Sequence, residues 1–298
     1  MHYIVLGGGS SPERDVSLRS AIQVNEALVS FKHETTLLDP QEVTMEQIID
    51  QARQSDGVFP ILHGEGGEDG VLQSAFEAAH IPFFGSTADA CRKTFDKVVF
   101  KQLLQAHHLP TPAWNTVSLE SLANEPLTNS PFVIKPIQGG SSIDTFIVRS
   151  IPFDDTPIKE ALGRYETMLI EVLIEGTETT VGVLESTALP VIEIIPPQDL
   201  EFDYENKYNG ATQELCPPVN VSTNTQLQLQ ALAEQVHSIT GCRHLSRTDI
   251  LIDKTGAFFI IDTNTIPGLT AQSLYPKAAL VAGLSWPQLV QRFTTLVP

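Results

Sequence analysis

A predicted β-hairpin near the end of the chain constrains its fold and chemistry more than any other segment. The sequence D-K-T-G at 253–256 is a turn signal between two apolar, β-branched runs, which is typical of a hairpin. Asp262 and Asn264 are two residues apart on the second strand, so their side chains share one face of the sheet. A loop of about three or four residues brings Asp249, on the first strand, opposite or next to Asp262.

Two carboxylates and an amide oxygen then meet on one patch of sheet. Oxygen ligands of this kind suit Mg²⁺ that also holds phosphate. Arg247 lies two residues before Asp249, so its side chain points to the same face. Proline and glycine follow directly at 266–270, which suggests backbone shaped for a ligand. The alternative is an exposed hairpin face that happens to be acidic.

The composition narrows the class of protein and its partners. A chain of 298 residues favours two or three domains, and no apolar run reaches the ~18 residues that a membrane span needs. The net charge of −18 argues against nucleic acid and anionic membranes as partners. The start of the chain lacks the features of a signal peptide, and the three cysteines show no pairing pattern. We therefore expect a cytoplasmic protein.

Strands and helices alternate over the first part of the chain, which predicts a parallel sheet with helices on both faces. The expected strands are 3–9, 33–39, 57–64 and 81–85, and the helices between them end near residues 30, 53 and 79. A second unit contains a helix at 94–108 and strands at 131–136, 143–148 and 168–174. A third unit contains two strands, a helix at 224–240, the hairpin and a last helix at 274–297. The predicted domains are 1–93, 94–176 and 177–298.

The loop K-P-I-Q-G-G-S-S at 135–142 joins two strands and has little side-chain bulk. Its backbone N–H groups and hydroxyls could cradle a phosphate, with Lys135 as a cation at the base. Lysines are scarce, so Lys97 at a helix start and Lys207 in a long polar loop are further candidates for phosphate contacts. The alternatives are a flexible hairpin tip and solvated surface lysines.

Two carboxylates and the N-terminal segment point to ligands other than phosphate. Glu171 lies inside the apolar run L-I-E-V-L-I, and a buried carboxylate there needs a donor such as an adenine amino group. The alternative is that Glu171 faces solvent on an edge strand. Glu178, at the start of the next element, could bind the ribose hydroxyls. The glycine loop at 7–9 leads into a helix whose N-terminus could hold a carboxylate, while Glu13 could bind an ammonium. Those two features describe a pocket for an amino acid.

Taken together, these segments resemble the D-alanine–D-alanine ligase family of the ATP-grasp superfamily over essentially the whole chain. The matching motifs are E-R-D-V-S-L (13–18), L-H-G-E-G-G-E-D-G (62–70), F-D-K (95–97), K-P-I-Q-G-G-S-S (135–142), L-P-V-I-E-I-I-P-P (189–197), Y-E-N-K-Y (204–208), R-T-D (247–249) and D-T-N-T-I-P-G-L-T (262–270). The resemblance implies an α/β ATP-grasp fold, in which an N-terminal parallel-sheet domain and two α+β domains enclose the nucleotide.

The resemblance also implies a nucleotide and metal site. Lys97 and Lys135 would hold the α- and β-phosphates of ATP, Ser142 and its loop would close over them, and Lys207 would reach the γ-phosphate. Adenine would lie between Glu171 and Ile174, with Glu178 on the ribose. Two Mg²⁺ (or Mn²⁺) would be held by Asp249, Asp262 and Asn264.

For the amino acids, the resemblance implies a further set of roles. Glu13 would bind the ammonium of the first D-alanine near His63, and Ser141 and Tyr208 would tie the loops shut with it. Arg247 and the N–H of Gly268 would stabilise the tetrahedral intermediate. Ser273 and Leu274 would receive the carboxylate of the second D-alanine.

The implied activity is ATP-dependent joining of two D-alanines through an acyl phosphate, for bacterial peptidoglycan synthesis, by a homodimer. Two departures from the family pattern leave alternatives open. Asp262 replaces a usual glutamate in the metal set, and Asp144 replaces a common glycine and puts negative charge near the nucleotide. One alternative is a catalytically weakened, nucleotide-binding paralogue. The other is a ligase that uses D-lactate or D-serine as its second substrate.

Overall fold

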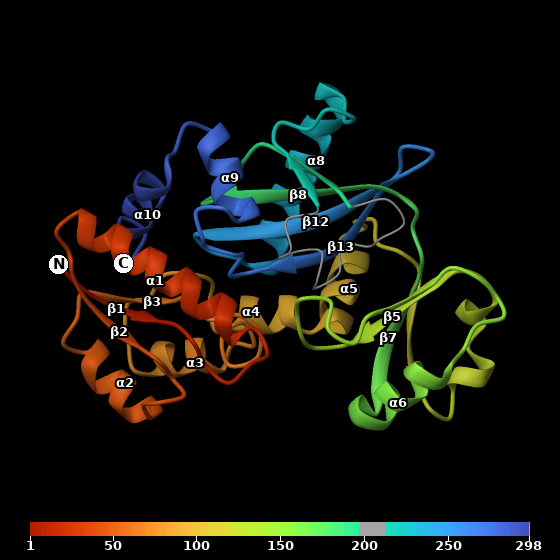
Figure 1. Cartoon of the computed structure of the whole chain (residues 1–298), viewed down its shortest axis with the longest axis horizontal. Coiled ribbons are helices and arrows are strands. Elements are labelled where there is room, and N and C mark those ends of the chain that lie inside the picture. Colours follow the sequence, from red (N-terminus) through yellow and green to blue (C-terminus); the bar gives the residue numbers. More distant parts are fainter. Residues whose placement is uncertain (197–211, 298) are drawn as a thin grey trace.

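The first part of the chain forms a parallel sheet, as expected. The computed structural model describes residues 1–196 and 212–297 (Figure 1). The strands lie in the order β2 (Glu34–Leu38), β1 (His2–Leu6), β3 (Gly57–Pro60). Tyr3 and Val5 pack in one core cluster with residues of α1 (Arg14–Ser30), whereas Ile4 and Leu6 pack in another with residues of α2 (Met45–Ala52) and α3 (Val71–Ala78). Helices therefore cover both faces because successive side chains point to opposite sides.

The second sheet is antiparallel and carries the glycine-rich loop. Its strands lie in the order β4 (Trp114–Ser118), β7 (Thr167–Val172), β5 (Phe132–Pro136), β6 (Phe146–Val148). Helix α6 (Thr156–Tyr165) packs on this sheet through Ile158, Ala161 and Leu162. Two short 3₁₀ helices, η1 (Leu122–Asn124) and η2 (Pro126–Asn129), precede β5. The loop from β5 to β6 projects from this sheet toward the N-terminal part of the molecule (Figure 1).

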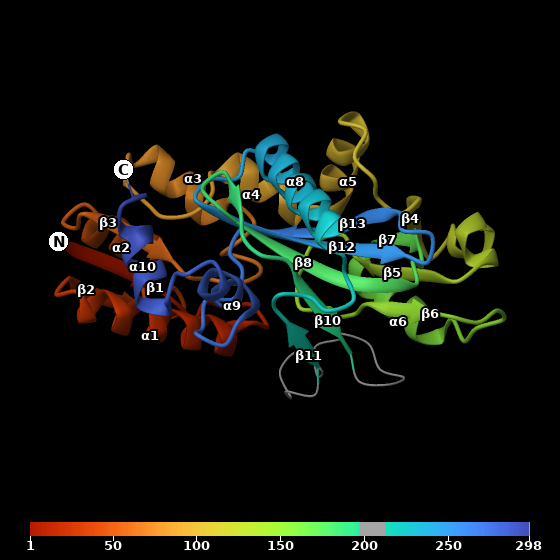
Figure 2. The same ribbon diagram turned by 90° about the horizontal axis from the view of Figure 1, so that it is seen from above.

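The third sheet contains the hairpin and is the largest of the three. Its main path is β11 (Gln213–Leu215), β10 (Ile192–Ile195), β8 (Gly176–Leu184), β12 (Leu245–Asp253), β13 (Phe258–Asn264), and β9 (Thr187–Ala188) pairs with β8. Helices α8 (Thr223–Thr240) and α5 (Lys97–Ala106) cover one face, where their apolar residues share a cluster with Val181, Ile250 and Ile260 (Figure 2). Residues of the second and third sheets line a common cavity.

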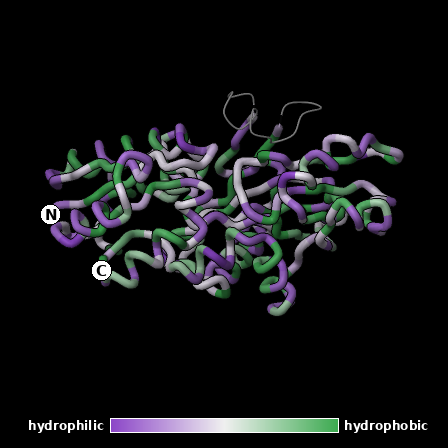
Figure 3. The backbone as a smooth tube through the Cα atoms, turned by 90° about the horizontal axis from the view of Figure 1, so that it is seen from below, coloured by the Kyte–Doolittle hydropathy of each residue, from purple (hydrophilic) through white to green (hydrophobic). Residues whose placement is uncertain are grey.

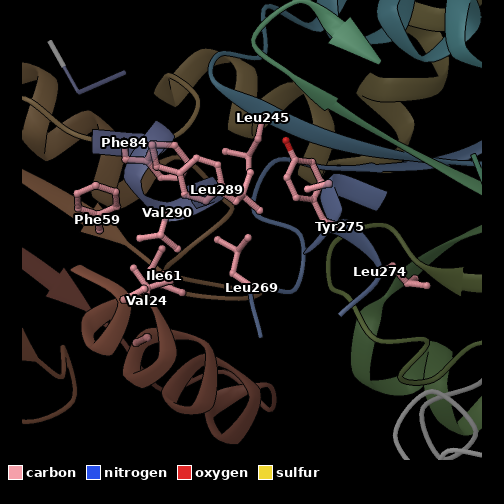
Figure 4. Packing of buried hydrophobic residues seen from close by; sticks show 14 of the residues in the cluster. Val24, Phe59, Ile61, Phe84, Leu245, Leu269, Leu274, Tyr275, Leu289 and Val290 are labelled. Carbon is pink, nitrogen blue, oxygen red and sulfur yellow. The ribbon is translucent and has the colours of Figure 1, made fainter. Parts of the chain in front are cut away.

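The C-terminal helices bind the third sheet to the first. Tyr275 of α9 (Leu274–Val281) and Leu289 of α10 (Trp286–Thr294) belong to the same core cluster as Val24 of α1 and Leu245 of β12 (Figure 4). Hydrophobic and hydrophilic stretches alternate along the chain (Figure 3). Among the described residues, no helix has both the length and the apolar content to cross a membrane.

Three of the expected elements are wrong in detail. Residues 81–85 form only an isolated bridge between Phe83 and Val58, not a strand. The helix expected at 94–108 is two helices, α4 (Ala88–Phe95) and α5, because Asp96 is extended and its side chain caps α5 by accepting from the N–H groups of Val98 and Val99. The last helix is also two, and Gly283 between them has a φ of 92°.

The domain limits 1–93, 94–176 and 177–298 stay predictions. The strands of the parallel sheet and of the second sheet fall within the first two ranges, and those of the third sheet fall within the third range except that β8 begins one residue earlier, at Gly176. Neither β4 nor α6 was predicted from the sequence. Both are short elements whose place depends on the sheet that they join.

Candidate active site

One large cavity lies where the three sheets meet, with a volume of about 1410 Å³. All the predicted site residues within the described part of the chain line it. They are Glu13, His63, Lys97, Lys135, Ser141, Ser142, Glu171, Ile174, Glu178, Arg247, Asp249, Asp262, Asn264, Gly268, Ser273 and Leu274. The remaining two, Lys207 and Tyr208, lie outside the described residues. Segments that are far apart in the sequence therefore contribute the side chains of a single cavity.

The predicted register of the hairpin is confirmed. Asp249 on β12 pairs directly with Asp262 on β13, and Arg247 pairs with Asn264. The guanidinium of Arg247 donates to both carboxylate oxygens of Asp249, at 2.9 and 2.8 Å. Thr180 of β8 donates its hydroxyl to Oδ1 of Asp249 at 2.5 Å. Burial alone would lower the pKa of Arg247, but the carboxylates of Asp249, Asp262 and Glu68 together outweigh burial and raise it.

This donor set fits a hard cation that shares its coordination with phosphate. Two facing carboxylates and the Asn264 amide are too few for a closed protein cage, and the described residues contain no cluster of three or more histidine, cysteine or acidic side chains able to hold a metal alone. Mg²⁺ usually takes one or two carboxylates and completes its shell with water and substrate phosphate. The carboxylates of Asp249 and Asp262, with the Asn264 amide, match this mode of Mg²⁺ coordination.

The loop between β5 and β6 has the backbone of an anion cradle. Gly139, Ser141, Ser142 and Asp144 all have positive φ, from 50° to 122°, so successive N–H groups turn toward one side. Lys97, the first residue of α5, donates from Nζ to the Gly139 carbonyl at 2.7 Å. Its ammonium is therefore fixed at the base of this loop.

Glycine at position 140 allows the loop to approach α1. A Cβ atom there would lie 2.7 Å from Oε2 of Glu13. The Ser141 hydroxyl donates to Oε1 of the same carboxylate. The side chain of Asp144, which the sequence suggested as a negative charge near the nucleotide, instead pairs with Arg164 at 2.8 Å and accepts from the Tyr165 hydroxyl at 2.7 Å. The charge of Asp144 is thus tied to α6.

Glu171 is buried, as expected, but its partners are two lysines. Its Oε1 lies 2.5 Å from Nζ of Lys135, and its Oε2 lies 2.5 Å from Nζ of Lys101. Burial alone would raise the pKa of Glu171, but the two ammonium groups outweigh burial and lower it. The contact with adenine stays a prediction. Lys101 was not among the predicted site residues, although Lys97, Phe100, Lys101 and Leu104 have the spacing of one buried helix face.

The pocket around Glu13 contains a second buried carboxylate. Glu68 accepts a hydrogen bond from the N–H of Gly64 at 2.8 Å, and burial together with the Glu13 charge raises its pKa to about 8. His63 donates from Nδ1 to the Ile266 carbonyl at 3.1 Å, and its Nε2 accepts from Ser20 at 3.3 Å. Burial lowers the pKa of His63, which favours the neutral imidazole. Glu68 was not among the predicted site residues, and its only signal in the sequence is its place in the E-G-G-E-D-G loop.

The segment after β13 closes the cavity on the opposite side. Ser273 precedes α9 and interacts through Oγ with the N–H of Thr270 at 3.2 Å. A Cβ atom at Gly268 would lie 2.9 Å from that Oγ, so the backbone at Gly268 is close to Ser273. Gln23 of α1 accepts from the N–H of Ala271 at 2.7 Å, which attaches this segment to the N-terminal helix. Ser273 makes no side-chain cap hydrogen bond to α9, and the N-terminus of a helix suits a carboxylate.

Comparison with known families agrees with the motifs. Residues 103–295 match the model for the C-terminus of D-ala D-ala ligases, and residues 39–86 match the model for the N-terminus. A D-alanine–D-alanine ligase from Nitratidesulfovibrio vulgaris is 36% identical over 302 aligned positions, which cover 99% of this chain and 98% of that protein. The corresponding ligase from Methylacidiphilum infernorum is 38% identical and covers 98% of this chain and 93% of its own.

Solved structures agree as well. A D-alanine–D-alanine ligase from Bacillus anthracis superposes with a TM-score of 0.84 at 27% identity and covers 100% of this chain and 97% of that one. The structure of the Bacillus anthracis ligase complexed with ATP gives a TM-score of 0.85 at 25% identity, with the same coverage. The expected ATP-grasp fold is confirmed. From its motifs, its family matches and its relatives, the chain belongs to the D-alanine–D-alanine ligase family.

Proposed function

We propose that this protein joins two D-alanines to D-alanyl-D-alanine at the expense of ATP, releasing ADP and phosphate, for bacterial peptidoglycan synthesis. The observation that carries the proposal is the hydrogen bond from Ser141 to Glu13. It brings a phosphate cradle against a carboxylate suited to an amino-acid ammonium. Transfer of a phosphoryl group to the carboxylate of that amino acid requires this proximity.

ATP would lie between the second and third sheets. Lys97 and Lys135 would contact its α- and β-phosphates, and Ser142 would close over them. Adenine would lie near Glu171 and Ile174, with the ribose at Glu178. All six residues line the cavity, and the lysines lie at the loop that would hold the phosphates. Lys207, proposed for the γ-phosphate, lies outside the described residues.

Asp249, Asp262 and Asn264 would hold Mg²⁺ (or Mn²⁺) beside the phosphates. A divalent cation bound there would neutralise phosphate oxygens and lower the cost of phosphoryl transfer. The direct pairing of Asp249 with Asp262 supports this assignment. Asp262 is one methylene shorter than glutamate, so we expect a weaker hold on the metal than in ligases with glutamate at this position.

The reaction would proceed in two steps. A carboxylate oxygen of the first D-alanine attacks the γ-phosphorus, the bond to the β,γ-bridging oxygen breaks, and ADP leaves with that electron pair. The ammonium of the second D-alanine loses a proton, and the resulting amine attacks the acyl carbon. The C–O bond then breaks, phosphate leaves with that electron pair, and the nitrogen loses a second proton to give the amide. Arg247 and the N–H of Gly268 would stabilise the negative oxygen of the tetrahedral intermediate. Ser273 and the start of α9 at Leu274 would hold the second carboxylate.

Water must be kept from the acyl phosphate. The Ser141–Glu13 contact closes one side of the cavity, and the segment attached to α1 through Gln23 closes another. Tyr208, proposed as part of the cover, lies outside the described residues. We also propose a homodimer in the cytoplasm, from the family resemblance and the sequence composition.

Phosphate release from ATP tests the proposal. Purified protein with Mg²⁺ and ATP should release phosphate only when millimolar D-alanine is added, with one dipeptide formed for each phosphate. A protein that binds ATP but releases no phosphate with D-alanine would instead be the catalytically weakened, nucleotide-binding paralogue. The observation that favours this second candidate is the shorter carboxylate of Asp262 in the metal set. The third candidate is a ligase that uses D-lactate or D-serine as its second substrate. It is distinguished by replacing half of the D-alanine with one of these compounds and identifying the product.

A further inference from the structure

A fully buried lysine lies behind the nucleotide wall of the cavity. Lys101 of α5 has an exposed fraction of 0%, and it does not line the cavity. Its Nζ is 2.5 Å from Oε2 of Glu171 and donates to the hydroxyl of Thr111 at 2.7 Å. Thr111 donates in turn to the carbonyl of Ile260 on β13 at 3.0 Å. Lys101 is thus fixed between the carboxylate of the second sheet and the strand that carries Asp262.

The charges around Glu171 do not cancel. Glu171 has an exposed fraction of 2% and lies between the ammonium groups of Lys101 and Lys135. Two cations and one anion leave one positive charge, and of the two lysines only Lys135 reaches the cavity. Without Lys101, the carboxylate of Glu171 would neutralise Lys135 at the same short distance. The attraction between that pair would be strong because both groups are shielded from water.

We propose that Lys101 is a positioning residue that neutralises Glu171, so that the charge of Lys135 remains available to the phosphates of the bound nucleotide. The inference rests on the proposed function, because it takes Lys135 to contact phosphate. Lys101 itself would touch no substrate. A purely structural role would not require a charge, since methionine has a similar volume and suits an apolar interior.

Charge-balanced variants test this role through binding, without any need for turnover. Adenosine and ADP share their base and ribose, so the ratio of their dissociation constants isolates the contribution of the phosphates. In K101M, calorimetry should show ADP binding weakened about tenfold or more and adenosine binding changed less than about twofold. The double variant K101M/E171Q removes the carboxylate as well and should recover most of the ADP affinity relative to adenosine.

Two further variants control for folding and net charge. Lys93 is paired with Asp89 on the surface of α4, so K93M loses one positive charge that is not paired with Glu171 and should leave both affinities unchanged. E171Q keeps both lysines and remains informative if K101M is too unstable to purify. Its ADP affinity relative to adenosine should equal or exceed that of the unmodified protein.

Several results would overturn the inference. K101M could bind ADP with the affinity of the unmodified protein, or its affinities for ADP and adenosine could fall equally. The double variant K101M/E171Q could also show no higher ADP affinity than K101M. A lower ADP-to-adenosine preference in E171Q would contradict it too. Failure of the unmodified protein to bind ADP would contradict the proposed function instead, so the two failures are distinguishable.

Discussion

The hydroxyl of Ser141 donates a hydrogen bond to Oε1 of Glu13, 128 residues away in sequence. This contact joins the loop between β5 and β6 to the residue that precedes α1. The positive φ of Ser141 and the absence of a side chain at Gly140 allow the close approach. The phosphate cradle and the amino-acid pocket are therefore one structural unit.

Removal of this contact should affect the amino acid more than the nucleotide. In S141A we expect the KM for D-alanine to rise about tenfold or more, because a hydrogen bond to a charged group contributes about 1.5 to 3 kcal/mol. The dissociation constant of ADP should change less than about threefold. Steady-state kinetics and calorimetry measure the two quantities. S150A, at an exposed serine, is the matched control, and an unchanged KM in S141A would contradict the role of Ser141.

The metal assignment predicts opposite results for two changes at Asp262. D262A should lower turnover at least about a hundredfold and abolish the increase in ADP affinity that Mg²⁺ causes, because one facing carboxylate is lost. D262E restores the longer side chain and should keep or raise turnover. D50A, at an exposed aspartate on α2, should change neither. An active D262A variant with normal Mg²⁺ dependence would place the metal elsewhere.

The hairpin was predictable because its constraints are local. A short turn and the two-residue period of a strand fix which side chains of β12 and β13 face each other, and Asp249 does pair with Asp262. The ends of helices were less predictable. The break at Asp96 depends on a side chain that caps α5 instead of continuing α4, and the sequence around it is compatible with one long helix.

The environment of Glu171 was only partly predictable. The apolar run around it indicated burial, and the structure confirms that. Its partners, Lys101 and Lys135, come from a helix and a neighbouring strand, so their meeting depends on how α5 packs against β7. Nothing local distinguishes Lys101 from an exposed lysine of an amphipathic helix. Tertiary packing alone determines that the Lys101 ammonium faces the carboxylate.

Stability should fall in mild acid because of buried neutral histidines. Burial, with Arg243 and His237 nearby, lowers the pKa of His244 to about 4, and Nδ1 of His244 accepts the N–H of Gly85 at 3.0 Å. The unfolded chain binds more protons than the folded chain between the ordinary pKa of 6.5 and about 4. His244 therefore contributes stability above pH 6.5 that is lost as the pH falls, by about 2 kcal/mol.

The change H244N should reduce this pH dependence. An asparagine keeps an acceptor, does not titrate, and tolerates the positive φ of 67° at this position. Urea unfolding at pH 4.5 and 7 should show a smaller difference in the free energy of unfolding for H244N than for the unmodified protein. H107N, at an exposed histidine, is the control. Equal pH dependence in H244N and the unmodified protein would show that His244 does not titrate as described.

The second substrate should be an amine at neutral pH. Tyr208 lies outside the described residues, so this expectation rests on the sequence and the family resemblance. A phenol with an ordinary pKa near ~10 is uncharged at pH 7 and does not repel the ammonium of D-alanine, whereas an imidazolium would. Competition between D-alanine and D-lactate should give mainly the dipeptide at pH 7. Mainly ester at pH 7 would contradict the role proposed for Tyr208, and Y208H should move the product toward ester.

The most direct test of the proposed ligase follows the oxygen atoms of D-alanine. If the carboxylate attacks the γ-phosphorus and phosphate leaves from the acyl carbon, one carboxylate oxygen must pass into each phosphate released. With ¹⁸O in both carboxylate oxygens, Mg²⁺ and ATP, mass spectrometry should find one ¹⁸O per phosphate and one dipeptide per ADP. Release of ADP with unlabelled phosphate would contradict an acyl phosphate in this cavity, and release of ADP with no dipeptide would contradict the ligation of two D-alanines.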